Sequence, residues 1–237
     1  MKNFVAIDTE YVSCHRTNGN SFFHPRAEMK KKDLKNVKYR DGKRKSLRRI
    51  IQVAAVKMDL DGNELESVSH YVRLDSEWTF QEDARDAQVV NISKETLRTQ
   101  GVPWIDAYEK ILGLFDDRTE CMVAHNYLGA DLDVLEIECE LRGLKWPYGK
   151  ETSKWRCTRE MYKEKGHPGS SKLEDCYRFL VQDEGRAEDV HDALEDARMA
   201  GKIYAKLRPK GTQMLLTGQD GEETSRKRQR EESDLLI

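Results

Sequence analysis

Residues 4–10 read FVAIDTE, a run of four apolar residues that leads directly into the two carboxylates Asp8 and Glu10. An apolar run of this length predicts a buried β-strand. Side chains at positions i and i+2 of a strand lie on the same face, so Asp8 and Glu10 should lie close together. Two like charges at such a distance repel each other, so either one carboxyl is protonated or a cation lies between them.

The composition of the chain predicts one soluble α/β domain with additional polar segments. The 237 residues are 35% charged and 38% hydrophobic, and the formal net charge of −2 gives no general signal for nucleic acid. The five cysteines include no CxxC pair, so we expect neither a disulfide framework nor a zinc site, and we expect an intracellular, cytoplasmic or nuclear setting. We expect no signal peptide, membrane span or membrane partner.

Hydrophobic periodicity divides the chain into expected strands and helices. The expected strands are 3–9, 49–58, 66–74 and 120–124, of which the second and third form a hairpin around the turn LDGNE. The expected helices are 93–101, 105–115, 131–143, 171–181 and 190–207, and a short strand followed by a helix is expected over 154–164. Ser93 is the expected N-cap of the first helix, and Gly101 its end. This order predicts an α/β fold, a mixed sheet with a meander at one side and helices covering it.

Two polar segments lie outside this pattern. Between residues 26 and 49 there are twelve lysines and arginines against three acids, so we interpret residues 12–48 as a basic insertion. The insertion begins beside Glu10 and could contact phosphates, or it could be a solvated loop without a role. We expect the domain to span 1–208 and residues 209–237 to be a disordered tail, whose RKRQR motif is either a nuclear import signal or a non-specific basic run.

Three further polar side chains lie at expected element boundaries. Asp131 follows the strand at 120–124 and starts a helix, so it could be an N-cap, or it could be a ligand residue at the end of the sheet. His191 and Asp196 are five residues apart, which is a rotation of about 140° on a helix. They can face the same site only if the helix begins just after His191. Asp196 lies at the edge of the apolar face of its helix, where a charge is costly unless it is paired or bound to a metal.

The ordered set DTE, then HNYLGAD, then HDALED resembles the DEDD superfamily of 3′→5′ exonucleases in its histidine variant, DEDDh. It is similar to the proofreading exonucleases typified by the epsilon subunit of bacterial DNA polymerase III and to the Trex-type nucleases. RIIQVAAV, WRCTREMYK and SSKLEDCYRFL are also similar to family segments. The chain departs from the family in its long basic link between strands and in Val90–Ser93, where the family carries a histidine-containing stretch. The resemblance implies a ribonuclease H-like mixed sheet, a three-stranded antiparallel meander plus parallel strands, flanked by helices.

Four carboxylates without soft ligands suit Mg²⁺ or Mn²⁺, and two such ions would stabilise the attacking and leaving oxygens at a phosphodiester. The resemblance implies that Asp8, Glu10, Asp131 and Asp196 hold the two ions. It implies that His191 is the general base that takes a proton from the attacking water. The expected partner is the 3′ end of DNA or RNA, and the expected product is a nucleoside 5′-monophosphate.

Four neighbouring residues are candidate substrate contacts: Thr9, Tyr11, His125 and Asn126. Tyr11 could stack on a terminal base or belong to the core, and His125 and Asn126 could contact substrate or shape their loop. Nothing in the sequence separates a ribonuclease from a DNA exonuclease. The alternative function is a catalytically inactive nucleic-acid-binding module of the same fold.

Overall fold

The computed structural model describes residues 2–18, 22–23, 43–44, 47–149, 153–182 and 191–209. Most of the expected basic insertion and nearly all of the expected tail therefore lie outside the described residues. Among the described residues, no helix combines the length and the apolar character that a membrane crossing requires.

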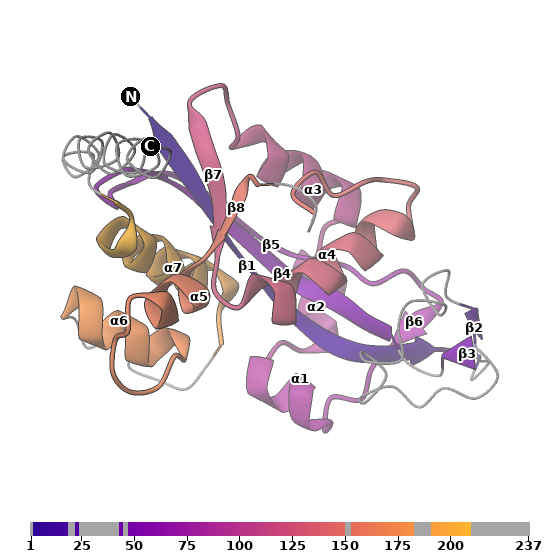
Figure 1. The fold of residues 1–237 in the computed structure, drawn as a ribbon. Coiled ribbons are helices and arrows are strands. Elements are labelled where there is room, and N and C mark those ends of the chain that lie inside the picture. The colour runs from indigo at the N-terminus through magenta and orange to yellow at the C-terminus, as the bar shows by residue number, and fades with distance from the viewer. Residues whose placement is uncertain are drawn as a thin grey trace, which may run out of the picture. The chain divides into compact units, whose positions relative to one another are not determined.

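The main sheet has the strand order β5-β4-β1-β7-β8 (Figure 1). Its strands are β1 (Asn3–Arg16), β4 (Leu47–Asp59), β5 (Glu64–Tyr71), β7 (Thr119–Ala124) and β8 (Trp155–Cys157), and the short β6 (Trp78–Thr79) pairs with the far end of β1. The β1, β4 and β5 strands pair antiparallel, whereas β7 pairs parallel with both β1 and β8. This is the mixed sheet with an antiparallel meander that the sequence predicts.

Strand β1 is longer than expected, because it continues through Arg16 and pairs with β4, which begins at Leu47. The expected insertion, residues 12–48, therefore begins within β1 and ends within β4. Val12 and Cys14 alternate with polar neighbours and are fully buried, as the period of a half-buried strand requires. Between the two strands, β2 (Phe22–Phe23) and β3 (Lys43–Arg44) form a separate antiparallel pair.

The described helices match the expected positions with two additions. They are α1 (Arg85–Val90), α2 (Lys94–Gln100), α3 (Trp104–Gly113), the 3₁₀ turn η3 (Tyr127–Gly129), α4 (Asp131–Glu140), α5 (Thr158–Glu164), α6 (Leu173–Val181) and α7 (Ala193–Leu207). Ser93 caps α2 as expected, because its Oγ accepts a hydrogen bond from the backbone N–H of Thr96 at 3.0 Å. The short α1 and the 3₁₀ turn η3 were not expected.

The central strand β1 is buried on both faces by different helices. Val5 and Ile7 pack in one apolar cluster with α3 and α4. Phe4 and Ala6 pack on the opposite face in a second cluster with α7. The helix α7 approaches this face closely at Gly201, where an added Cβ would collide with the sulfur of Met58. The two faces of one strand therefore meet the two helices that carry Asp131 and Asp196.

Candidate active site

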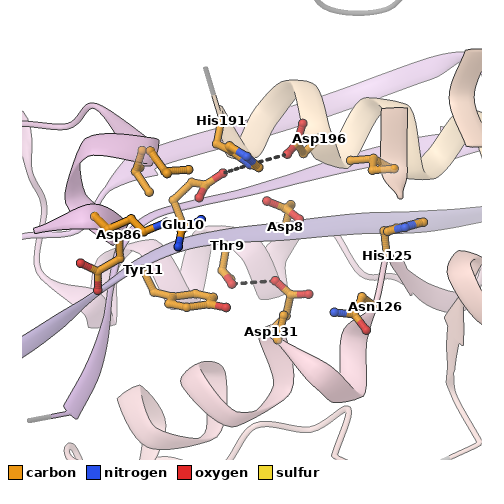
Figure 2. A pocket seen from close by; sticks show the side chains of 15 residues that line it. Asp8, Thr9, Glu10, Tyr11, Asp86, His125, Asn126, Asp131, His191 and Asp196 are labelled. Atoms are coloured by element: carbon orange, nitrogen blue, oxygen red, sulfur yellow. Dashed lines mark hydrogen bonds and ion pairs between the residues drawn. The ribbon is translucent and has the colours of Figure 1, made fainter. Parts of the chain in front are cut away.

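All nine candidate site residues line one cavity of about 590 Å³ (Figure 2). Its lining also includes six residues that the sequence did not indicate as site residues: Arg85, Asp86, Val89, Val90, Ala130 and Leu173. The candidates come from three segments that are far apart in the chain, namely β1, the segment from β7 to α4, and the start of α7. The fold therefore brings together every residue that the sequence singled out for this site.

The alternation of β1 distributes its polar side chains between the two faces. Asp8 and Glu10 continue the face of Phe4 and Ala6, which packs against α7. Thr9 lies on the other face, where its Oγ1 donates a hydrogen bond of 2.7 Å to Oδ1 of Asp131. In the view of Figure 2, Asp8 lies between Asp131 and Asp196.

Glu10, His191 and Asp196 form a close group of possible metal ligands. Nδ1 of His191 lies 3.8 Å from Oε1 of Glu10 and 3.7 Å from Oδ2 of Asp196. One ligand atom from each of the three residues lies within 4.8 Å of the others, a spacing that can hold a metal ion. The His191 side chain is 43% exposed, whereas those of Glu10 and Asp196 are 10% and 6% exposed. The imidazole therefore forms the solvent-facing side of a pair of buried carboxylates.

The carboxyl group of Asp131 lies in an environment that opposes its negative charge. Asp131 is 2% exposed, and burial raises its pKa to about 7, although the hydrogen bond from Thr9 acts in the opposite direction. The negative charge of Asp196 adds to the rise. A divalent cation would stabilise the ionised form of such a group. The donor set of carboxylates without a thiolate therefore fits a hard cation that prefers oxygen ligands.

Asp131 does not cap its helix. It is the first residue of α4, the cap position is held by Ala130, and no side-chain cap bond is present there. Its neighbour Asp133 is exposed and does not line the cavity, as expected for a residue that faces away on the helix.

The start of α7 explains how His191 and Asp196 reach the same site. The helix begins at Ala193, so His191 lies on the segment before it, which was the condition for the two side chains to meet. Asp192 caps the helix, since its Oδ1 accepts from the backbone N–H groups of Leu194 at 3.0 Å and Glu195 at 3.1 Å. The sequence alone did not indicate that Asp192 is this cap.

His125 and Asn126 are held by hydrogen bonds to the protein. Nε2 of His125 lies 3.0 Å from the carbonyl of Ser171 and Nδ1 lies 2.9 Å from the hydroxyl of Thr158. A carbonyl can only accept, so Nε2 carries the proton, and burial lowers the pKa of the imidazole to about 4. Asn126 has a left-handed φ of 60°, and its Oδ1 accepts from Arg159 at 2.7 Å. Both side chains shape this loop, and a contact with substrate stays a prediction.

The helix α1 forms a wall of the cavity that the sequence did not reveal. Asp86 fixes α1 to β1, because its Oδ2 accepts from the backbone N–H of Ser13 at 2.8 Å. Val89 is 44% exposed although it lines the cavity. Nearby, the guanidinium of Arg48 lies 5.1 Å from the ring centre of Tyr11. Six residues without a cap or a clear period offered no signal for this helix.

A family model described as Exonuclease, RNase_T, matches residues 5–204, a range that contains all nine candidates. No curated protein matches the sequence significantly.

Several solved structures share the fold. E. coli exonuclease I in complex with a dT13 oligonucleotide aligns with a TM-score of 0.57 and 19% identity over 86% of this chain and 40% of that chain. The nuclease domain of 3′hExo, described as a DEDDh family member bound to rAMP, aligns with a TM-score of 0.56 and 14% identity over 84% and 96% of the two chains. This chain thus spans two fifths of the exonuclease I chain and nearly all of the 3′hExo domain. These similarities confirm the ribonuclease H-like fold class.

Proposed function

Because this chain belongs to the RNase_T exonuclease family, we propose that it is a metal-dependent 3′→5′ exonuclease of the DEDDh type. It releases nucleoside 5′-monophosphates from the 3′ ends of DNA or RNA. The observation that carries the proposal is the convergence of Glu10, His191 and Asp196, whose ligand atoms lie within 4.8 Å of one another, in a cavity that Asp8 and Asp131 also line.

The carboxylates supply the metal-binding half of the proposed site. Two Mg²⁺ or Mn²⁺ ions held by Asp8, Glu10, Asp131 and Asp196 would stabilise the charge that develops on the attacking and leaving oxygens. This assignment is supported by the burial of Glu10, Asp131 and Asp196, which are 7%, 2% and 5% exposed. Buried acids of this kind are expected to be paired or to coordinate a metal.

His191 is the proposed general base. Its imidazole contacts two carboxylates on one side and is 43% exposed on the other. The carboxylates orient the ring and stabilise the imidazolium that forms when it accepts a proton from the attacking water. Solvent access then lets the ring release that proton. Histidine is the side chain that most often serves as a general base in catalysis.

The substrate nucleotide is proposed to enter the cavity between α1 and α4. The exposed Val89 and the ring of Tyr11 offer apolar surfaces for a base. Thr9, His125 and Asn126 line the same cavity, and we keep them as candidate contacts. Exonuclease I is described with a DNA oligonucleotide and 3′hExo with rAMP, so a test needs both kinds of nucleic acid.

The test is degradation of 5′-labelled single-stranded DNA, double-stranded DNA and RNA of one sequence, with Mg²⁺, with Mn²⁺ and with chelator. We expect progressive shortening from the 3′ end, release of 5′-monophosphates and complete inhibition by chelator. Asp8→Ala and Asp196→Ala should abolish hydrolysis in folded protein, whereas the exposed Asp133→Ala serves as a matched control and should retain it. His191→Ala should slow hydrolysis by about 10²–10⁴-fold while metal binding persists.

Retained activity in Asp8→Ala or Asp196→Ala would refute the assignment. Oligonucleotide binding without any metal-dependent hydrolysis by the wild-type chain would favour the alternative, an inactive binding module.

A further inference from the structure

Gln52 is a buried polar residue in the otherwise apolar run IIQVAAV of β4. It is 3% exposed and lies opposite Glu10 in the β1–β4 pairing, next to an irregularity in the register. Its side chain contacts the start of α7, which is 140 positions away in the chain. Nε2 donates a hydrogen bond of 3.0 Å to Oδ2 of Asp192, and Oε1 accepts one of 3.3 Å from the backbone N–H of Ala193.

These two bonds join the strand beside Glu10 to the segment that positions His191 and Asp196. Asp192 follows His191 directly, and its other carboxylate oxygen caps the first turn of α7. Asp196 lies on that first turn, where its backbone N–H donates to the carbonyl of Asp192 at 3.0 Å. The side-chain amide of Gln52 therefore binds both Asp192, which caps α7, and the backbone N–H of Ala193, the first residue of α7.

We propose that Gln52 is a positioning residue, which sets the spacing between Glu10 on β1 and the pair of His191 and Asp196 on α7. The kinetic part of this inference rests on the proposed exonuclease function. A displacement of about 1 Å at a reacting centre can cost about 10²-fold in rate. Residues that orient metal ligands typically contribute about 10–100-fold to metal affinity or activity.

The chemistry of this contact requires an amide. The carboxylate of Asp192 needs a donor, and the N–H of Ala193 needs an acceptor. Glutamine offers both on one side chain, whereas an ionised glutamate offers only acceptors and methionine offers no strong group of either kind. Glutamate would also bring a third carboxylate close to Asp192 and Glu10. The proposal therefore predicts different behaviour for glutamine, glutamate and methionine at position 52, although their side chains are nearly equal in volume.

The test compares Gln52→Met and Gln52→Glu with the double variant Gln52→Glu/Asp192→Asn. In the double variant the donor and the acceptor are exchanged, the hydrogen bond is restored, and asparagine remains a good N-cap. Thr119→Val is the matched control. It removes polar contacts at the other end of β1, where the Thr119 hydroxyl donates to Asn3 at 2.8 Å and accepts from the backbone of Asp116 at 3.0 Å.

Three measurements are made on each variant: hydrogen exchange of the first turn of α7, Mn²⁺ affinity by calorimetry, and kcat and KM on an oligonucleotide. For Gln52→Met we expect exchange at Leu194 and Glu195 at least about tenfold faster than in Thr119→Val. We expect Mn²⁺ affinity and kcat to fall by about 10–100-fold with little change in KM. The double variant should recover slow exchange and most of the affinity that Gln52→Glu loses.

The proposal is overturned if Gln52→Met matches Thr119→Val in exchange and affinity, or if the double variant does no better than Gln52→Glu. If the wild-type chain degrades no oligonucleotide, the proposed function fails, and the exchange measurements alone still decide the role of Gln52.

Discussion

The helices α4 and α7 bring carboxylates to opposite faces of β1, and each is anchored to β4 by different chemistry. α4 is held by an ion pair in which Nε of Arg49 lies 2.6 Å from Oε1 of Glu138 and both side chains are fully buried. The same oxygen of Glu138 accepts from the backbone N–H of Ile50 at 3.1 Å. α7 is held by the neutral amide of Gln52. A buried ion is very costly once its partner is lost, whereas a neutral contact is less so. We therefore expect loss of the contact that holds α4 to lower mainly the stability of the domain. We expect loss of the contact that holds α7 to disturb mainly the geometry of the site.

The largest expected effect comes from the carboxylates themselves. Metal-ion stabilisation of a transition state is worth several kcal/mol, and about 1.4 kcal/mol is tenfold in rate, so Asp131→Asn and Asp196→Asn should each lower exonuclease turnover by at least about 10³-fold. Their effects on metal-free stability should differ. Burial raises the pKa of Asp131 to about 7. At pH 8 the folded protein therefore carries an ionised carboxylate in an environment that opposes its charge, which costs stability. Asp131→Asn removes this cost and should raise the free energy of unfolding relative to Asp196→Asn. Urea unfolding at pH 8 with chelator measures this, and equal midpoints would contradict it.

The next largest effect tests the ionic anchor. Arg49→Met removes the fully buried partner of Glu138 but leaves it paired with Arg142, whose Nη1 lies 2.8 Å from Oε2 of Glu138. The variant should lower the free energy of unfolding by about 3 kcal/mol. The control is Arg118→Met, which breaks an ion pair to Asp116 in which the arginine side chain is 59% exposed, and its loss should be much smaller. Denaturant unfolding of the two variants compares them directly. Equal losses would show that the buried pair does not anchor α4 as described.

A smaller effect is expected from the hydrogen bond between β1 and α4. Thr9→Val keeps the shape of the side chain but removes the 2.7 Å bond to Asp131. Hydrogen bonds to charged groups contribute about 1.5–3 kcal/mol, so turnover should fall by about tenfold or more while oligonucleotide affinity stays near that of the wild type. Single-turnover kinetics and binding measured with Ca²⁺ separate the two quantities. A drop in affinity alone would instead support a direct contact between Thr9 and substrate.

The smallest expected effect concerns pH and the loop before α4. Burial lowers the pKa of His125 to about 4, below its ordinary value near 6.5. The unfolded chain therefore binds more protons than the folded chain between these values, and the stability contributed by neutral His125 is lost as the pH falls from about 6.5 to 4. His125→Gln should remove about 1 kcal/mol of the stability change between pH 7.5 and pH 5.5. Urea midpoints at the two pH values measure this change in stability. A pH dependence equal to that of the wild type would contradict the prediction.

The sequence predicted the central strand from a local signal, and it singled out the candidate residues that line the cavity from the ordered combination of three motifs. FVAIDTE has the apolar run of a buried strand. Its two acids lie on one face at the end of that run, where two like charges are unfavourable without a partner. The edge position of Asp196 on the apolar face of its helix was likewise visible in the sequence, and in the structure this side chain is 6% exposed. What each residue does in the site was an inference from family resemblance, and it stays a proposal.

The parts that the sequence did not reveal depend on contacts between distant segments. The pairing of Arg49 with Glu138 joins positions 89 apart. The sequence gives no signal that two charged residues in separate elements form an ion pair. Gln52 did leave a trace, since it is a polar residue inside an apolar strand. Its partner, however, lies at the start of α7, and the alignment of β4 with α7 is decided by tertiary packing. The helix α1 has only six residues, which is too few for a period to be recognised.

The alternation of β1 has a consequence for how this chain can change over evolutionary time. Successive side chains of β1 pack against two different helices. The identity of individual residues in the strand can therefore change, whereas the number of residues in it cannot. Deleting one residue before Asp8 would move every later side chain to the opposite face, so Asp8 and Glu10 would face α4 instead of α7. A loop outside a strand has no such constraint, because each doubling of a flexible loop costs only about 0.6 kcal/mol. Insertions in this family should therefore accumulate after the strand and be excluded from within it.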